Sequence, residues 1–234
     1  MKPARDLGLA PGERLRSQMR EAGLGGALLQ GVWRRLVRGY LRAAHSLCVE
    51  GRENLPASPP FVLVANHCSH LDALTLSAVL SGEAARRAHV LAAGDYFFGN
   101  AAASAFAAYA VNALPVWRKR TGRRDIATLR ERLVQDRLVY ILFPEGTRSR
   151  DGRMGPFQPG LGALVAGTAV PVVPCHLHGA HAAWPAGRGL PRPGPLRLVI
   201  GPALDARGLT NDRAGWEALA RGCETAVRQL GEAG

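Results

Sequence analysis

The sequence predicts an α/β fold, a single domain with a mostly parallel central sheet flanked by helices and preceded by an N-terminal amphipathic helical segment. Two observations carry this prediction. Short, continuous apolar runs recur after Gly51, as expected of strands that are buried on both faces of a parallel sheet. Stretches with helical spacing lie between these runs, and such alternation of strand and helix is typical of layered α/β folds.

The first expected strand is Phe61–Ala65, an apolar run that follows Pro59-Pro60. Further strands are expected at His89–Ala92, Ala113–Trp117, Leu138–Phe143, Val170–Leu177 and Leu196–Ile200. Helices are expected near residues 72–81, 97–111, 124–136, 160–168 and 212–230. We therefore expect two parts, a helical segment over residues 1–48 and the α/β domain over residues 49–234.

Length and composition exclude several classes of protein. The chain has 234 residues, of which 47% are hydrophobic and 21% charged, as in an ordinary globular domain. Its four cysteines form no C-x-x-C pair and are expected to be small buried hydrophobes: Cys48, Cys68, Cys175 and Cys223. The N-terminus lacks the apolar core of a signal peptide, so a reducing, cytosolic setting is expected.

The basic charge calls for an anionic partner. Lys and Arg number 30 against 18 Asp and Glu, a net charge of +12, which suits nucleic acid, an anionic membrane surface or a phosphorylated substrate. The chain has only 14 Phe, Trp and Tyr residues and no recognisable nucleic-acid-binding motif, so nucleic acid is not the expected partner. Half of the charge lies in residues 1–45, which hold 9 basic and 3 acidic residues.

That basic region contains a predicted amphipathic helix over residues 28–47. Its apolar stripe consists of Leu29, Trp33, Leu36, Val37, Tyr40, Leu41 and Ala44. Arg34, Arg38 and Arg42 recur on another face. The pattern fits either an interfacial membrane helix or a helix packed on the core with solvated arginines, and the sequence leaves both interpretations open. The uncharged stretch Phe97–Trp117 is rich in alanine and interrupted by polar residues and proline, so we expect a buried helix and strand there rather than a transmembrane helix.

The first cluster of reactive side chains follows the strand at residues 61–65. It reads Asn66-His67-Cys68-Ser69-His70-Leu71-Asp72, at the strand end where α/β proteins place their ligands. With His67 in the turn before a helix, Asp72 in the first helical turn can fold back to its Nδ1. This contact would fix the tautomer and leave Nε2 as a general base. A histidine that only caps the helix, a metal site of His67, His70 and Asp72, and a Cys68 nucleophile are the alternatives.

The second cluster follows the strand at residues 138–143. It reads Pro144-Glu145-Gly146-Thr147-Arg148, and a glycine, a hydroxyl and a guanidinium together suit an anionic ligand. The strand at residues 113–117 also ends in a basic run, Arg118-Lys119-Arg120. Two basic strand ends beside a His/Asp pair indicate a phosphorylated substrate with a reacting hydroxyl.

These motifs resemble a known family. Asn66-His67-x4-Asp72, Phe143–Arg148 and Val170–Pro174 are similar, in order and spacing, to blocks I, III and IV of the glycerolipid acyltransferases of the PlsC-like, lysophosphatidic acid acyltransferase type. The resemblance covers about residues 50–205. In the stretch Asn112–Arg118 only a hydrophobic step and Arg118 correspond to block II.

The resemblance implies that His67 is the general base for the acceptor hydroxyl and that Asp72 orients it. It also implies a set of residues that bind the acceptor's glycerol phosphate: Arg118, Glu145, Gly146, Thr147 and Arg148. Val170–Pro174 would form the acyl-binding wall. No metal and no cofactor are expected, and the acyl donor would be acyl-CoA or acyl-carrier protein.

The expected reaction is transfer of a fatty acyl group to the free hydroxyl of a lysophospholipid, such as 1-acylglycerol-3-phosphate, which gives phosphatidic acid. Another lysolipid acceptor, such as a lyso-amino-acid lipid, is an alternative, and a metal-dependent phospholipid hydrolase is an alternative of another class. The expected location is peripheral, on the cytoplasmic side of the cell membrane. The basic N-terminal helix would hold the protein on an anionic membrane surface.

Overall fold

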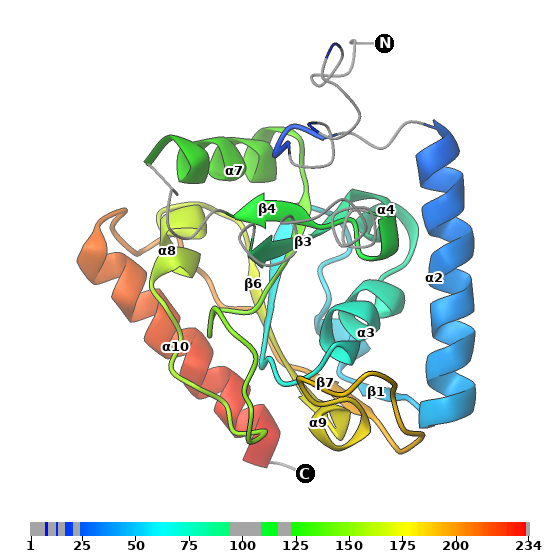
Figure 1. Cartoon of the computed structure of the whole chain (residues 1–234). Helices are drawn as coiled ribbons and strands as arrows, with labels where there is room; N and C mark the ends of the chain where they lie inside the picture. Colours follow the sequence, from blue (N-terminus) through cyan, green and yellow to red (C-terminus); the bar gives the residue numbers. More distant parts are fainter. Residues whose placement is uncertain are drawn as a thin grey trace.

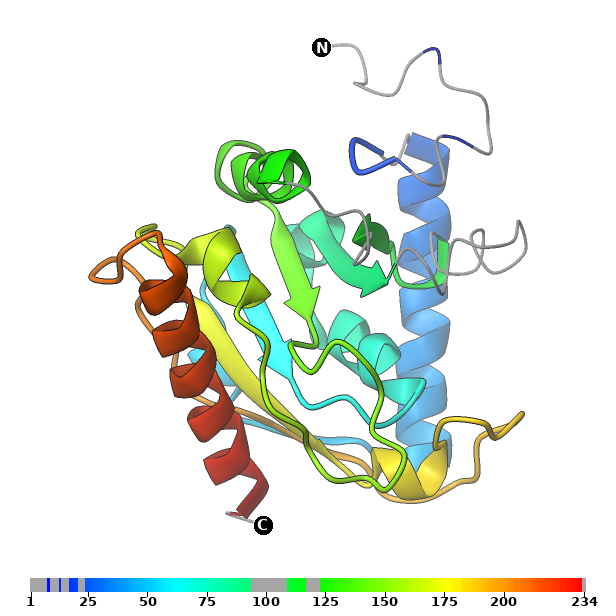
Figure 2. The same cartoon turned by 60° about the vertical axis from the view of Figure 1, so that its left-hand side comes forward.

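The computed structural model describes residues 8, 13, 17–20, 24–93, 109–116 and 123–232. These residues form a seven-stranded sheet that is covered by helices on both faces (Figures 1 and 2). The predicted α/β fold with its mostly parallel sheet is confirmed. Every neighbouring pair of strands is parallel except one.

The strands are β1 (Cys48–Glu50), β2 (Phe61–Ala65), β3 (Ala88–Ala93), β4 (Leu114–Val116), β5 (Val139–Leu142), β6 (Val172–His178) and β7 (Arg197–Ile200). The helices are α2 (Leu24–His45), α3 (Leu71–Val79), α4 (Gly82–Arg87), α7 (Arg123–Gln135), α8 (Gly160–Val165), α9 (Ala180–Ala183) and α10 (Arg213–Glu232), with a 3-10 turn η1 (Arg52–Asn54). The spatial order is β1-β7-β6-β2-β5-β3-β4, and β6 with β7 is the antiparallel pair.

The central strand β2 shows how the sheet is buried. All five of its side chains are buried, and successive residues point to opposite faces. Phe61, Leu63 and Ala65 join a core cluster with buried side chains of α2, α3 and α4. Val62 and Val64 join a second cluster with α7, α8 and α10. The continuous apolar run therefore serves two cores, as expected for a strand between two helical layers.

Helix α2 divides its apolar residues between the core and the solvent. Val37 and Leu41 are buried against the body of the protein, and Trp33 packs against the same cluster. Leu28 and Leu36, in contrast, remain 74% and 63% exposed. The apolar residues that the sequence predicts as a single stripe thus belong to two faces of α2. One face packs on the core, as expected of a core-packed helix, and the other is apolar and exposed, as expected of an interfacial membrane helix.

Several elements differ from the sequence prediction. The short elements β1, α4 and α9 are absent from it because three to six residues are too few to show a period. Most of the helix predicted over 97–111, and the basic run Arg118-Lys119-Arg120, lie outside the described residues. The expectation that the cysteines are buried is wrong for Cys48, which is exposed, and correct for the other three. Among the described helices, none combines the length and the apolar character needed to cross a bilayer.

The close contact between α8 and α10 requires a glycine at position 162, and this requirement can be tested. A Cβ atom placed on Gly162 would lie 2.2 Å from Trp216 Cα, so the two helices could not keep their separation. We expect Gly162→Ala to lower the free energy of unfolding by about 1–3 kcal/mol. Thermal unfolding measures this as a loss of several degrees in Tm.

Gly160→Ala in the same helix is the matched control, since a Cβ there would meet no atom within 4 Å. An unchanged or slightly raised Tm is expected for the control. Equal Tm values for both variants would show that α8 and α10 are not in close contact.

Candidate active site

Asn66 fixes the point at which the chain leaves the sheet after β2. Its side-chain amide donates to the carbonyl of Leu177 at 3.2 Å, and its Oδ1 accepts from the Leu177 N–H at 2.9 Å. The side chain thus adds two hydrogen bonds to β6 directly after the last backbone pairing of β2 with β6. Nothing in the motif around Asn66 predicts this role, because the partner lies 111 residues away.

The chain then turns so that one carboxylate oxygen gathers three donors. Asp72, in the first turn of α3, is completely buried, and its Oδ2 lies 2.8 Å from His67 Nδ1, from the Cys68 N–H and from the Ser69 N–H. The fold-back of Asp72 onto His67 expected from the sequence is therefore present. Because the carboxylate accepts at Nδ1, the Nε2 of the neutral His67 ring is left with its lone pair.

The His67 ring keeps a partly open edge. Its side chain is 18% exposed, and one face of the ring stacks on Phe143 with ring centroids 4.1 Å apart and an angle of 17° between the planes. Phe143 immediately follows β5, the parallel neighbour of β2. The imidazole is thus held by Asp72 in its plane and by Phe143 on its face.

Glu145 holds the backbone of this site. Its Oε1 accepts from the His67 N–H at 2.7 Å, and its Oε2 accepts from the Gly155 N–H at 2.8 Å. Burial raises the pKa of Glu145, while these two N–H groups lower it. The resemblance implied that Glu145 binds substrate, whereas both of its oxygens here bind backbone. This arrangement positions His67 through its main chain.

Arg148 reaches across to His70. Its Nη1 lies 2.9 Å from His70 Nδ1, and burial together with this guanidinium lowers the pKa of His70 to about 4. His70 is therefore neutral near pH 7 and accepts from a cation. A guanidinium on His70 leaves no place for a metal shared with His67 and Asp72. In the part of the chain that the structure describes, no three His, Cys, Asp or Glu side chains are grouped to hold one.

Cys68 lies next to His67 in sequence, but its thiol is not part of the reactive group. The side chain is buried, and burial together with nearby Asp72 raises the pKa of the Cys68 thiol well above its usual range. The thiolate needed of a nucleophile is thus disfavoured.

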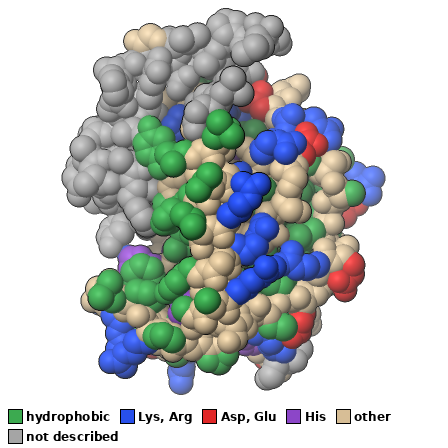
Figure 3. Space-filling model, turned by 90° about the vertical axis from the view of Figure 1, so that its right-hand side faces the viewer, with side chains coloured by type: hydrophobic (Ala, Val, Ile, Leu, Met, Phe, Trp, Pro, Cys, Tyr) green, Lys and Arg blue, Asp and Glu red, His purple; other side chains and the backbone are tan. Residues whose placement is uncertain are grey.

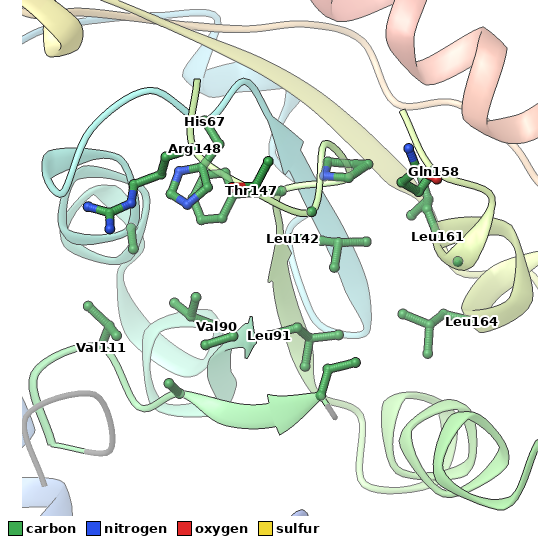
Figure 4. Close-up of a pocket in the computed structure, with 18 of the residues that line it drawn as sticks. His67, Val90, Leu91, Val111, Leu142, Thr147, Arg148, Gln158, Leu161 and Leu164 are labelled. Atoms are coloured by element: carbon green, nitrogen blue, oxygen red, sulfur yellow. The ribbon is translucent and has the colours of Figure 1, made fainter. Parts of the chain in front are cut away.

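A largely apolar cavity of about 480 Å³ opens beside His67. Figure 4 shows His67, Thr147 and Arg148 at one end of it and a wall of aliphatic side chains beyond them. The aliphatic residues include Val90, Leu91, Val111, Leu142, Leu161 and Leu164. The volume is in the range of small-molecule sites. His67, Thr147 and Arg148 make one end polar, and Gln158 is a polar residue beside Leu161 in the otherwise aliphatic wall.

The cavity lies where the sheet divides. Strand β3 lies between β5 and β4, and it pairs with β5 only over its first half, Ala88–Val90, while its second half, Leu91–Ala93, pairs with β4 on the opposite edge. Leu142, at the end of β5, and Leu91, in the second half of β3, therefore stand on either side of a gap and both line the cavity. The space is built into the strand pairing.

The predicted site residues are distributed unequally over this cavity. His67, Gly146, Thr147 and Arg148 line it, and Asp72 lies behind His67. Arg118 lies outside the described residues. The predicted acyl wall Val170–Pro174 is different, because its residues belong to the β6 region of the core and none is among the residues that line the cavity.

An α/β sheet with a His–Asp pair at its strand ends and an apolar cavity beside it is an arrangement that can support general-base chemistry on a partly apolar ligand. The chain belongs to the acyltransferase family, whose model matches residues 46–178. The resemblance suggested by the motifs is therefore confirmed at the level of the family.

Individual relatives agree with this family. A chloroplastic 1-acyl-sn-glycerol-3-phosphate acyltransferase, BAT2 of Brassica napus, is 34% identical over 156 residues, which cover 65% of this chain and 43% of that protein. The human 1-acyl-sn-glycerol-3-phosphate acyltransferase alpha is 34% identical over 146 residues, covering 60% of this chain and 49% of the human protein. The chain thus spans less than half the length of these two relatives.

A solved structure shares the fold. The crystal structure of PlsC, the 1-acyl-sn-glycerophosphate acyltransferase from Thermotoga maritima, superposes with a TM-score of 0.65 at 24% identity. The match covers 89% of this chain and 79% of that one.

The backbone role of Glu145 leads to a prediction about stability. A glutamine at this position has one acceptor oxygen, so Glu145→Gln cannot accept from both the His67 and Gly155 N–H groups. We expect a loss of about 1–3 kcal/mol in the free energy of unfolding, from one unsatisfied, partly buried N–H group. Thermal unfolding of wild type and Glu145→Gln measures this loss as a lower Tm.

Thr147→Ala is the control, because Thr147 is an exposed side chain in the same loop. Its Tm should stay within a degree or so of wild type, as for other surface substitutions. A Glu145→Gln variant as stable as the control would mean that the carboxylate does not hold the backbone.

Proposed function

We propose that the protein is an O-acyltransferase that moves a fatty acyl group from an acyl thioester to the free hydroxyl of a lysophospholipid. The observation that carries the proposal is the His67–Asp72 pair, 2.8 Å apart, at the polar end of the apolar cavity. The proposed acceptor is 1-acylglycerol-3-phosphate and the product phosphatidic acid, as the names of the relatives suggest. The proposed donor is acyl-CoA or acyl-carrier protein.

In the proposed step, His67 Nε2 takes the proton of the acceptor hydroxyl as its oxygen attacks the thioester carbonyl carbon. A C–O bond forms and the C–S bond breaks. The departing thiolate then takes this proton from the His67 imidazolium, and His67 returns to its starting form. Asp72 holds the ring through Nδ1 and stabilises the imidazolium while it exists. This scheme requires no metal and no cofactor besides the donor.

The two ends of the cavity suit the two parts of such substrates. The aliphatic wall around Leu142 and Leu164 fits an acyl chain. Thr147 and Arg148, at the same end as His67, offer a hydroxyl and a guanidinium to the acceptor's phosphate. Arg118 is a further proposed phosphate ligand from the resemblance alone. A lyso-amino-acid lipid, the alternative acceptor, has no phosphomonoester to bring to Arg148.

The general-base role makes a kinetic prediction. His67→Ala should lower kcat by about 10²–10⁴-fold, the usual contribution of such a group. Asp72→Asn should also lower kcat, because an amide in place of the carboxylate no longer stabilises the imidazolium. The assay follows labelled acyl-CoA and acyl-carrier protein with a panel of lysolipid acceptors, including 1-acylglycerol-3-phosphate.

Cys68→Ala is the matched control beside His67, and it should retain activity because its thiol has a raised pKa and is not used. Residual activity of His67→Ala above about a hundredth of wild type would remove the general-base assignment. Loss of activity with EDTA, together with release of free fatty acid, would instead favour the metal-dependent hydrolase.

We also propose that α2 holds the enzyme at the cytoplasmic face of the membrane as a peripheral protein. The outer face of the helix carries Leu28, Leu29, Val32 and Leu36, all more than half exposed. Arginines flank this apolar face, and Figure 3 shows basic and hydrophobic side chains gathered side by side on this side of the molecule. A helix with these two faces suits the interface of a bilayer that contains anionic lipids.

The loop between α9 and β7 supports the same orientation. Leu190 is 79% exposed, and arginines stand at positions 188 and 192 on either side of it. The loop is fixed to the end of α2, because the Gly194 N–H donates to the Ala44 carbonyl at 3.2 Å and His45 Nδ1 lies 3.0 Å from the Gly194 carbonyl. Figure 2 shows this loop at the foot of α2.

The membrane role predicts a loss of binding when the exposed face is made polar. Val32→Gln combined with Leu36→Gln should weaken partitioning onto anionic vesicles by tenfold or more, at about 1.5–3 kcal/mol for each buried aliphatic side chain. Vesicle flotation measures this loss. Val134→Gln is the control, because Val134 is an exposed aliphatic residue on α7. Equal binding of all three proteins would contradict the proposed role of α2.

A further inference from the structure

A second cavity lies between α2, the chain around β1 and the end of α3. Its volume is about 220 Å³, and three of the seven residues that line it are arginines: Arg38, Arg42 and Arg52. The remaining lining residues are Leu47, Val49, Ala78 and Val79. The cavity shares no lining residue with the one beside His67.

Two of the three guanidinium groups are held in place by the end of α3. Arg38 donates from Nε and Nη2 to the Ala78 carbonyl at 2.9 and 2.7 Å, and from Nη2 to the Leu80 carbonyl at 3.0 Å. Arg52 donates from Nη1 to the Val79 carbonyl at 3.2 Å. These carbonyls lie at the C-terminal end of α3, where helix carbonyls lack partners in the helix itself. The two cations are therefore ordered before any ligand binds, which lowers the entropic cost of binding.

Each arginine keeps donors for a ligand. Nη1 of Arg38, and Nε and Nη2 of Arg52, make no hydrogen bond to any described residue, and neither does the whole Arg42 guanidinium. Arg38 and Arg42 are four residues apart, so they project from neighbouring turns of the same face of α2. All three arginines line the same cavity.

The residues that line the cavity carry three positive charges. Among the described residues that line it, none carries a carboxylate. Glu50 is close in sequence, but it pairs with Arg197 at 3.5 Å. Burial, and then the charges of Arg42, Arg52 and Arg35, lower the pKa of Arg38. Three cations around a small cavity whose described lining holds no carboxylate are expected to attract an anion.

We propose that this cavity binds the phosphomonoester head group of a membrane lipid, and we name it the arginine cavity. Guanidinium groups match the oxygens of a phosphate in pairs, and three of them suit a dianionic, terminal phosphate better than a phosphodiester that is covered on both sides. A terminal phosphate is also the chemical class of the acceptor and of the product in the proposed reaction.

The place of the cavity on α2 explains how a lipid would reach it. At 100° per residue, Arg42 lies about 40° around the helix from Leu28, at the border of the exposed apolar face. A helix lying with that face in the bilayer interface would hold Arg42 at the level of the head groups. The inference rests on the proposed membrane role of α2, but it does not depend on acyl transfer.

The test measures a preference between two lipids at equal surface charge. The full chain is mixed with phosphatidylcholine vesicles that contain either phosphatidic acid or phosphatidylglycerol, in amounts adjusted to equal zeta potential. Wild type should bind the phosphatidic acid vesicles about tenfold more tightly, the effect of one further charge-assisted hydrogen bond. Arg42→Gln should bring the ratio of the two affinities close to one, and Arg42→Lys should lower it while retaining the charge.

Arg35→Gln is the matched control, because Arg35 is an exposed arginine of α2 that does not line the cavity. It should weaken binding to both vesicles and leave the ratio unchanged. The proposal would be overturned if wild type bound both kinds of vesicle with equal affinity. It would also be overturned if Arg35→Gln and Arg42→Gln lowered the ratio of the two affinities by the same amount.

Inorganic phosphate separates the two sources of the same group. If it raises the Tm of wild type but not of Arg42→Gln, while wild type shows no preference between the vesicles, the cavity holds free phosphate and the lipid assignment is wrong. Failure of wild type to bind either vesicle would overturn both the membrane role and this inference. An inactive wild type that keeps its preference would refute acyl transfer alone.

Discussion

The site depends on a single buried oxygen, Asp72 Oδ2. A buried carboxylate must find its partners within the protein, and here three donors from the preceding turn reach Oδ2 at 2.8 Å each, while the buried Oδ1 has no hydrogen-bond partner among the described residues. Two of these donors are backbone N–H groups, so the same contacts that stabilise the buried carboxylate also hold the turn in shape. The turn that leads into α3 therefore also sets the orientation of the His67 ring, because both are bound to the same oxygen.

The parts of the site that could be predicted from the sequence are the local ones. His67 and Asp72 are five residues apart, and one turn of chain is enough to bring them together. The backbone role of Glu145 could not be predicted, because it contacts His67 from 78 residues away and the motif gives no register between β2 and β5. The contact between Arg148 and His70 spans the same separation and could not be predicted for the same reason.

The fold was predictable where strands are buried on both faces, since an apolar run of five residues such as Phe61–Ala65, bounded by prolines and polar residues, is typical of a central strand. It was less predictable for α2, because the 3.6-residue period shows that a helix has an apolar side but not how much of that side the protein covers. The position of the cavity was also not predictable. It depends on the pairing of β3 with β5 ending at Val90, and both halves of β3 read as one continuous strand in the sequence.

The early end of the pairing between β3 and β5 affects the stability of the sheet. Where β3 leaves β5, the sheet gives up ladder hydrogen bonds, and β4 remains attached through only three residue pairs, Leu91 to Ala93 with Leu114 to Val116. An edge strand held in this way depends on side-chain contact across the gap for its remaining stability. An acyl chain between Leu91 and Leu142 would supply that contact. On the proposed function, the substrate would thus act as a temporary piece of the hydrophobic core, and the enzyme without substrate would be the less complete of the two folded states.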